Sequence, residues 1–233
     1  MAAQTPGKIF LADQRGLVET SYHRRYCTFS FGDYAHAHKG PFGRLHGFNE
    51  ETLAGTQTLA LPIGQATYVL LIPITGDLAY RTATLPMATL QVGEMQLLTL
   101  PSGDALHLAN PYETELISFL HLWVHAAEPT LPIATQRFTF NLAAAPNQLI
   151  EVLPPLANQG LPFGVRIGQF AGRREANYHV QPGADFFAFV LAGAFEVEGR
   201  LLHEHDGLAL WQVADVELEA LSNYATILVL ELN

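Results

Sequence analysis

The histidines of this chain are its first candidates for metal chemistry. The segment Pro101–Asn110 (PSGDALHLAN) places His107 on a short expected strand, directly after a turn that contains Pro and Gly. Zinc and iron sites in proteins usually take three or four ligands, so a single histidine holds a metal poorly. The question is where further ligands for His107 would come from.

Two other groups of histidines have spacings that could suit a metal. His36 and His38 are separated by one residue and lie in a loop of Gly, Lys and Pro, where solvated side chains are the simpler interpretation. Residues 203–206 (HEHD) alternate two imidazoles with two carboxylates, but they precede Gly207 at an expected turn, where exposed polar residues are usual. We expect adventitious zinc or nickel binding at most from these groups.

The charge of the chain bears on its partners. Its 233 residues have a formal net charge of −10 and no cluster of Lys or Arg, so nucleic acid and an anionic membrane surface would both be repelled. The pair Arg24 and Arg25 lies between Tyr22 and Tyr26. This pair could meet an anionic or aromatic ligand, but it is too short to form a nucleic-acid stripe.

The sequence also bears on location and redox chemistry. No apolar run approaches the roughly 20 residues that span a bilayer. The N-terminal residues contain no apolar stretch of signal-peptide length, so we expect a cytoplasmic protein. Cys27 is the only cysteine, which excludes an internal disulfide and a thiolate cluster. Cys27 could be a redox-reactive thiol, although a small buried hydrophobic residue is the simpler interpretation.

Short strands are the elements that must position these residues. Apolar runs rich in Val, Ile, Phe, Tyr, Leu and Thr are broken repeatedly by Gly and Pro, and helical periodicity is scarce. The pattern predicts an all-β protein, a sandwich or barrel. The expected strands include residues 67–73, 78–84, 94–100, 115–124, 137–142, 165–170, 186–191, 207–213 and 226–232.

Two segments half a chain apart repeat one pattern. Residues 68–80 and 185–197 each contain an apolar strand, a glycine turn and a second alternating strand. Two tandem copies of one β-module are the simplest explanation. Pro, Asn and Ala concentrate in residues 143–160, which is typical of a boundary. We therefore expect two domains, residues 1–145 and 146–233.

Several motifs resemble those of cupins, which are small β-barrels of jelly-roll type. The pattern P-x-G-x-x-x-H-x-x-N over residues 101–110, after Gly93, is similar to the second cupin motif, and two such halves make a bicupin. Residues 28–34 (TFSFGDY) and 42–50 (FGRLHGFNE) resemble segments of the pirin family, and residues 183–199 resemble the pirin C-terminal barrel. The likeness covers nearly the whole chain and implies an all-β fold of two tandem cupin barrels.

The resemblance also implies where a metal would lie. Metal-bearing pirins hold iron in the N-terminal barrel, with three side chains from the first cupin motif and one from the second. In this chain the first three positions fall on Pro62, Gly64 and Tyr68, and only His107 keeps a ligating side chain. We therefore expect no cofactor, with iron or another divalent transition metal as the alternative.

Alternation along the expected strand predicts a pocket in place of the metal. Gly64 and Tyr68 should share a face, so we expect Tyr68 to fill part of the vacated site within reach of His107, directly or through one water. His121 flanks Trp123 and either lines the barrel or bonds to a backbone carbonyl in the core. The expected pocket residues are His107, Tyr68, Pro62, Gly64 and His121.

The second barrel offers a weaker set of ligands. Offsets from Gly193 that copy those in the first repeat fall on His179, Gln181 and Asp185. No histidine follows near residues 221–224, where a fourth ligand would fall, and pirin C-terminal barrels generally lack metal. These three residues are only weak metal candidates.

The resemblance implies two classes of function. Some bacterial pirins are metal-dependent dioxygenases that open quercetin, and others are regulators that bind partner proteins or sense redox state. Because three ligand positions are lost, our hypothesis is a metal-free pirin-like bicupin that acts as a small-molecule-binding, sensor or regulatory protein rather than an enzyme. A small aromatic or apolar ligand would suit its pocket. The alternatives are a quercetin-type dioxygenase with a rearranged site and a protein-interaction scaffold with a filled barrel, whose protein partner the sequence does not indicate.

Overall fold

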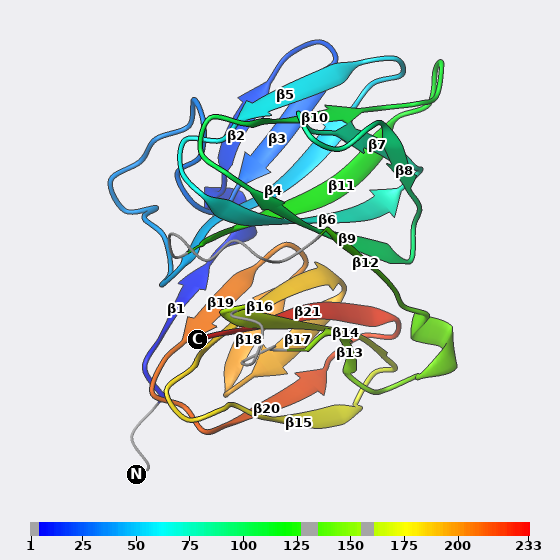
Figure 1. Cartoon of the computed structure of the whole chain (residues 1–233). Coiled ribbons are helices and arrows are strands. Elements are labelled where there is room, and N and C mark those ends of the chain that lie inside the picture. The colour runs from blue at the N-terminus through cyan, green and yellow to red at the C-terminus, as the bar shows by residue number, and fades with distance from the viewer. Residues whose placement is uncertain (1–4, 127–134, 155–160) are drawn as a thin grey trace. The chain divides into compact units, whose positions relative to one another are not determined.

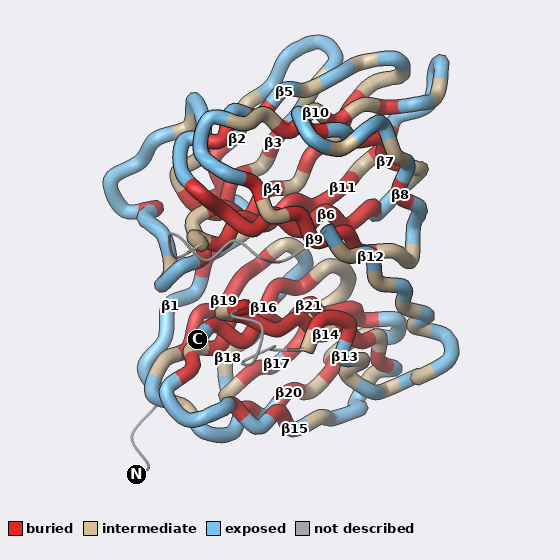
Figure 2. The backbone as a smooth tube through the Cα atoms, in the orientation of Figure 1, coloured by how far each residue is buried: buried red, intermediate tan, exposed pale blue. Residues whose placement is uncertain are grey.

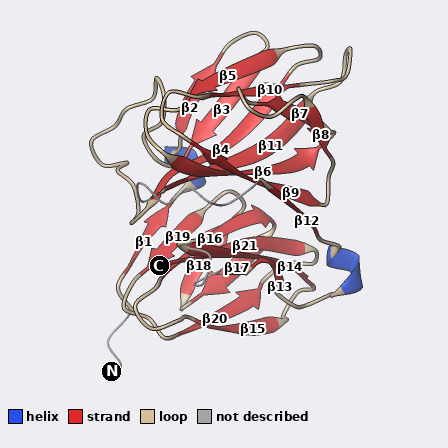
Figure 3. Cartoon of the chain, viewed as in Figure 1, coloured by secondary structure: helices blue, strands red, loops and turns tan. Residues whose placement is uncertain are grey.

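The computed structural model describes residues 5–126, 135–154 and 161–233, and these are almost entirely β-structure (Figures 1 and 3). The expectation of an all-β chain is therefore confirmed. Two short 3-10 helices, Ala12–Gln14 and Leu142–Ala144, accompany the strands. No helix in the described part has the length and apolarity needed to span a membrane.

The chain divides into two compact units. The N-terminal unit is Arg15–Thr139, and the C-terminal unit is Phe140–Asn233 together with the chain up to Gln14. Each unit has two antiparallel sheets, as expected for a jelly roll. Figure 2 shows that the buried segments of each unit follow its strands.

The N-terminal unit pairs a seven-stranded sheet, in the order β12-β9-β6-β11-β4-β3-β2, with a four-stranded sheet, in the order β5-β10-β7-β8. The larger sheet consists of β2 (Gly16–Glu19), β3 (His23–Cys27), β4 (Leu45–Leu53), β6 (Thr67–Thr75), β9 (Glu94–Leu100), β11 (Ile117–His125) and β12 (Gln136–Thr139). The smaller sheet consists of β5 (Thr58–Pro62), β7 (Leu78–Arg81), β8 (Ala88–Leu90) and β10 (Ala105–Ala109).

The core of the N-terminal unit fixes which face of each strand points inward. Val69 and Leu71 of β6 pack in one buried cluster with Leu106 and Leu108 of β10 and with Phe119 of β11. Residues from both sheets therefore meet between them, and every second residue of each strand faces this interior.

The C-terminal unit pairs a six-stranded sheet, in the order β1-β19-β16-β21-β14-β13, with a four-stranded sheet, in the order β15-β20-β17-β18. The larger sheet consists of β1 (Gly7–Phe10), β13 (Ile150–Leu153), β14 (Phe163–Phe170), β16 (Asp185–Ala192), β19 (Gly207–Leu210) and β21 (Ala225–Leu232). The smaller sheet consists of β15 (Glu175–His179), β17 (Ala194–Val197), β18 (Arg200–His203) and β20 (Asp215–Ala220).

The first strand of the chain belongs to the C-terminal unit, which differs from the expected ranges 1–145 and 146–233. β1 pairs with β19, so that Gly7 lies opposite Leu210. A Cβ at Gly7 would lie 2.8 Å from the carbonyl oxygen of Ala209, so this close approach requires glycine. Pairing between segments two hundred residues apart leaves no local signal in the sequence.

The HEHD segment anchors this N-terminal strand. Asp206 is 4% exposed, whereas an exposed turn residue was expected. Its Oδ1 accepts a hydrogen bond from the Ala12 amide at 2.7 Å, and its Oδ2 accepts one from the His203 amide at 2.8 Å. The carboxylate of Asp206 therefore has a structural role that occupies both of its oxygens.

Asp206→Ala should destabilise the C-terminal unit. The two amides lose their acceptor in a buried turn, which typically costs about 1–3 kcal/mol. Urea unfolding followed by circular dichroism would measure this loss. The matched control is Asp215→Ala, whose side chain is 75% exposed; its effect should stay within about 0.5 kcal/mol. An unchanged unfolding midpoint for Asp206→Ala would contradict the anchoring role.

Candidate ligand-binding site

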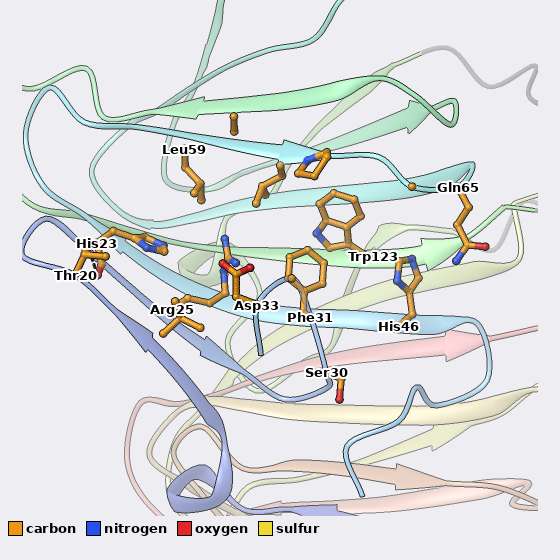
Figure 4. Close-up of a pocket in the computed structure, with 16 residues that line it drawn as sticks. Thr20, His23, Arg25, Ser30, Phe31, Asp33, His46, Leu59, Gln65 and Trp123 are labelled. Atoms are coloured by element: carbon orange, nitrogen blue, oxygen red, sulfur yellow. Dashed lines mark hydrogen bonds between the residues drawn. The ribbon is translucent and has the colours of Figure 1, made fainter. Parts of the chain in front are cut away.

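A cavity of about 720 Å³ opens in the N-terminal unit (Figure 4). It lies between the β2–β3–β4 side of the larger sheet and β5, the edge strand of the smaller sheet. The segment 30–33, the residues Gly64 and Gln65, and Trp123 of β11 complete its lining. All of these elements belong to one unit, so the cavity is a property of the N-terminal jelly roll alone.

Aromatic rings form one wall of the cavity. The rings of Phe31 and Trp123 meet edge to face, with centroids 5.1 Å apart and an angle of 60° between their planes. A Cβ at Gly47 would lie 3.0 Å from both of these side chains, so glycine at this position allows the rings to pack against β4. The Arg25 guanidinium lies 5.3 Å from the Phe31 ring centroid, in cation–π geometry.

A buried carboxylate organises the polar groups beneath this wall. Glu51 of β4 is 0% exposed. It lies opposite Arg25 of β3 in the strand register, and it accepts hydrogen bonds from Arg25 Nε and His23 Nε2. His121 Nε2 of β11 donates a third hydrogen bond at 2.7 Å. We call these four residues, Arg25, His23, His121 and Glu51, the carboxylate cluster.

The hydrogen bonds of His121 determine its tautomer. Trp123 Nε1 can only donate, and it lies 2.5 Å from His121 Nδ1. Because Nδ1 accepts this bond, the ring proton is on Nε2, which donates to Glu51. Burial is the strongest influence on the His121 pKa and lowers it, although Glu51 acts in the opposite direction. His121 is therefore a neutral link between the indole and the carboxylate.

Glu51 remains ionised in this setting. Burial alone would raise its pKa, but hydrogen bonds from His121 and His23, together with the charge of Arg25, lower the pKa to about 2. A buried ion of this kind is tolerated when its charge is paired and its lone pairs are satisfied. The carboxylate cluster meets both conditions.

Two polar groups beside the cluster lack partners. Arg25 Nη2 is buried and has no hydrogen-bond partner in the described structure. The same holds for both amide atoms of Asn49, which lies opposite His121 in the β4–β11 register. Buried polar atoms usually have partners, so these groups are exceptions that the carboxylate cluster leaves unsatisfied.

Cys27 lies next to Asn49 in the β3–β4 register and is 0% exposed. Burial, the strongest influence, raises the pKa of its thiol to about 11. The thiol is therefore protonated at neutral pH. Redox reactions need the thiolate, so this setting opposes the redox role that the sequence left open.

The structure places the five expected pocket residues differently. Pro62 and Gly64 line the cavity. Tyr68 and His107 do not, and their predicted contact is wrong. Tyr68 alternates with Val69 and Leu71, and His107 with Leu106 and Leu108, all of which are core residues. The side chains of Tyr68 and His107 therefore point away from the interior between the two sheets. The predicted inward face of each strand was one residue out of phase.

His121 is buried behind the cavity wall rather than lining it. Its ring centroid is 5.5 Å from that of Phe31, which does line the cavity. Its partners are the Glu51 carboxylate and the Trp123 indole, not a backbone carbonyl as expected.

The residues that face the interior do not fit a metal ion. Leu61 of β5 and Leu106 and Leu108 of β10 occupy the inward positions of the two strands that the cupin motifs define, and none has a donor atom. In the carboxylate cluster, His121 carries its proton on the nitrogen that faces Glu51, and the Arg25 cation lies against the same carboxylate. Among the described residues, no group of three or more His, Cys, Asp or Glu is placed to hold a metal.

The weak ligand set of the C-terminal unit does not converge. Tyr178 and Val180 belong to the core, so His179 and Gln181 face away from it. His179 bonds to Asp215 at 2.9 Å at an exposed position. Asp185 precedes the core residue Phe186 on β16 and points to the opposite face. The offsets from Gly193 therefore selected three residues whose side chains face away from the core.

Most residues of the site were not expected from the sequence. Of the pair Arg24 and Arg25, only Arg25 reaches the cavity. His23 and Glu51 were missed, as was Phe31. Alternation on β3 could have found His23, which shares one face with Arg25 and Cys27; no such signal marks Glu51 or Phe31.

Comparisons with known proteins agree with this architecture. Residues 164–232 match the protein-family model described as the quercetinase C-terminal cupin domain. YhhW from Escherichia coli has a solved structure with a TM-score of 0.85 and 18% identity, covering 98% of each chain. The bacterial pirin YhhW in complex with nickel(II) matches with a TM-score of 0.84 and 18% identity, covering 97% of this chain and 99% of that one.

A third structure extends the comparison. Quercetin 2,3-dioxygenase from Acinetobacter baumannii matches with a TM-score of 0.74 and 15% identity, covering 97% of this chain and 85% of that one. No curated protein sequence matches significantly. The fold is therefore that of a bicupin. The bacterial pirin YhhW has the same fold, as the resemblance drawn from the sequence implied.

Glu51→Gln tests whether the ionised carboxylate of Glu51 stabilises the fold. The folded-state pKa of Glu51 is depressed from 4.5 to about 2, so its contribution to stability is present above pH 4.5 and is lost as the pH falls towards 2. Glu51→Gln should lose about 3–5 kcal/mol at pH 7, because Arg25 keeps an uncompensated buried charge. It should also lack the wild-type decline in stability between pH 4.5 and 2.

Urea unfolding at several pH values would measure both effects. The matched control is Glu19→Gln, because Glu19 is 45% exposed and pairs with Arg24 at the surface. This control should change stability by less than about 1 kcal/mol. The interpretation fails if Glu51→Gln is as stable as wild type at pH 7.

Proposed function

We propose that this pirin-like bicupin is a small-molecule-binding protein that takes an aromatic ligand, without a metal, in the cavity of its N-terminal unit. The observation that carries the proposal is a cavity with an aromatic wall above a buried polar floor. Its volume of about 720 Å³ lies within the range of about 300–1,000 Å³ that is usual for ligand pockets. A sensor or regulatory role would follow from ligand binding at this site.

The wall favours a planar ligand. Phe31 and Trp123 both line the cavity, and aromatic rings such as theirs pack favourably against a further aromatic group. Arg25 lines the cavity beside Phe31, and its Nη1 lies near Gly32, another lining residue. A ligand with an oxygen at one end of an aromatic group would use both features.

The names of the similar proteins raise a second candidate, a quercetin-type dioxygenase. Such an enzyme needs a metal to activate its substrate and dioxygen. The inward positions of β5 and β10 carry leucine in this chain, and His107 faces away from the interior. These side chains favour the metal-free function.

Tryptophan fluorescence should detect the ligand. Trp211→Phe leaves Trp123 as the single tryptophan, and it lines the cavity. Titration with benzoate, phenylacetate, phenylpyruvate, indole and quercetin should give a saturable change for at least one compound. Phe31→Ala in the same background should weaken that binding at least about tenfold, because it removes half of the aromatic wall.

The matched control for this titration is Phe42→Ala. Phe42 is a half-buried aromatic residue of the same unit outside the cavity lining. It should leave the affinity unchanged. The proposal is refuted if no compound in the panel gives a saturable response.

Metal analysis should separate the two candidate functions. Protein purified without a histidine tag should contain only trace iron, nickel or copper by mass spectrometry, because the inward positions lack donor atoms. His107→Ala should leave the metal content unchanged. A near-stoichiometric metal that His107→Ala removes would establish the dioxygenase candidate instead.

A further inference from the structure

We infer that the cavity is also a cofactor-free catalytic site, in which His23 removes a proton from the carbon next to a carbonyl group and Arg25 holds the resulting enolate oxygen. This inference rests on the proposed binding of an aromatic ligand. It goes further by assigning a reaction to two residues of β3 that line the same cavity.

His23 has the setting of a general base. Its Nε2 bonds to Glu51, and a carboxylate only accepts hydrogen bonds, so Nε2 carries the ring proton. In a neutral imidazole the lone pair is then on Nδ1, for which the described structure records no partner. The side chain of His23 is 9% exposed and lies at the cavity. A carboxylate that fixes the tautomer and orientation of an imidazole stabilises the cation formed when that imidazole takes a proton.

Glu51 is well suited to this supporting role. Arg25 and His121 hold it in place from two other directions. Its low pKa keeps it ionised, so it does not itself take up the proton from His23. The negative charge of Glu51, which stabilises the imidazolium of His23, is therefore in position before the reaction.

Arg25 supplies the complementary group. Its Nε is bonded to Glu51, and its Nη1 lies beside Gly32, which lines the cavity; a Cβ at Gly32 would lie 3.3 Å from this atom. Donors that are fixed in advance and aimed at a developing negative charge are the main means by which proteins stabilise oxyanions. His23 and Arg25 are two residues apart on one strand, so their side chains leave the same face about 6–7 Å apart. Both side chains also reach the same Glu51 carboxylate, so a carbonyl group and its adjacent carbon can contact both residues at once.

The reaction needs no other reagent. The C–H bond breaks, its electron pair forms a C=C bond, and the carbonyl π electrons move to the oxygen. The proton is then on His23 Nδ1, and the enolate oxygen lies against Arg25. Return of the proton to carbon regenerates the keto form, and return to oxygen gives the enol. The net change is a tautomerisation, with no oxidant, reductant or metal.

The walls define the class of substrate as aryl-substituted carbonyl compounds. Phe31 and Trp123 would pack against the aryl group. An aryl group on the reacting carbon also makes its proton more acidic, because the enolate is conjugated with the ring. Phenylpyruvate is a simple probe that carries both features.

The test follows exchange of the phenylpyruvate methylene protons in D₂O by NMR. Wild-type protein should accelerate the exchange over buffer alone, and saturating phenylacetate, which has an aryl group but no ketone, should abolish the acceleration. His23→Gln keeps a donor for Glu51 but cannot accept a proton. It should lower the rate at least about a hundredfold, with the affinity for phenylpyruvate, read from Trp123 fluorescence, within a few-fold of wild type.

The matched control is His107→Gln. His107 lies in the same unit but outside the cavity, so the exchange rate should not change. Wild-type protein that binds phenylpyruvate without accelerating exchange, acceleration that phenylacetate leaves intact, or a folded His23→Gln that keeps the wild-type rate would overturn the catalytic inference and leave the binding function intact. No fluorescence response to any aromatic compound, together with no exchange, would overturn both.

Discussion

The N-terminal site depends on a carboxylate that is buried beyond the reach of water. A charge in that position is tolerated only when partners neutralise it and occupy its lone pairs. Glu51 meets this requirement through one cation and two imidazoles, drawn from the strands on either side of its own. The Glu51 carboxylate thereby fixes the register of β3, β4 and β11. It also determines the tautomer of His121, because it accepts the hydrogen bond that Nε2 donates.

The same constraint divides the interior of the jelly roll into two environments. Between β6 and β10 the inward side chains are aliphatic and aromatic, as in any packed core. Beside β3 and β4 the inward side chains are polar, and the cavity opens there. One bicupin fold can therefore surround interiors of different chemical character, and the fold alone does not determine the function.

The sequence predicted the architecture better than the site. Glycine turns and short apolar strands revealed an all-β chain, and two of the expected pocket residues, Pro62 and Gly64, do line the cavity. Tyr68 and His107 were assigned to the wrong faces because a shift of one residue along a strand reverses every side chain. Most of β6 is buried on both faces, so its sequence does not alternate between apolar and polar residues. The residues that face the interior therefore cannot be identified from the sequence.

Hydrogen bonds between residues far apart in the chain could not be predicted from the sequence either. Nothing near Glu51 in the chain indicates that His121, seventy residues away, will bond to it. The most direct test of the account is the protonation of His121, read by nitrogen NMR of protein labelled in its imidazole rings. We predict a neutral ring at pH 7, with the proton on Nε2 and an accepting Nδ1. A doubly protonated ring, or a proton on Nδ1 with Nε2 bound to a metal, would contradict it.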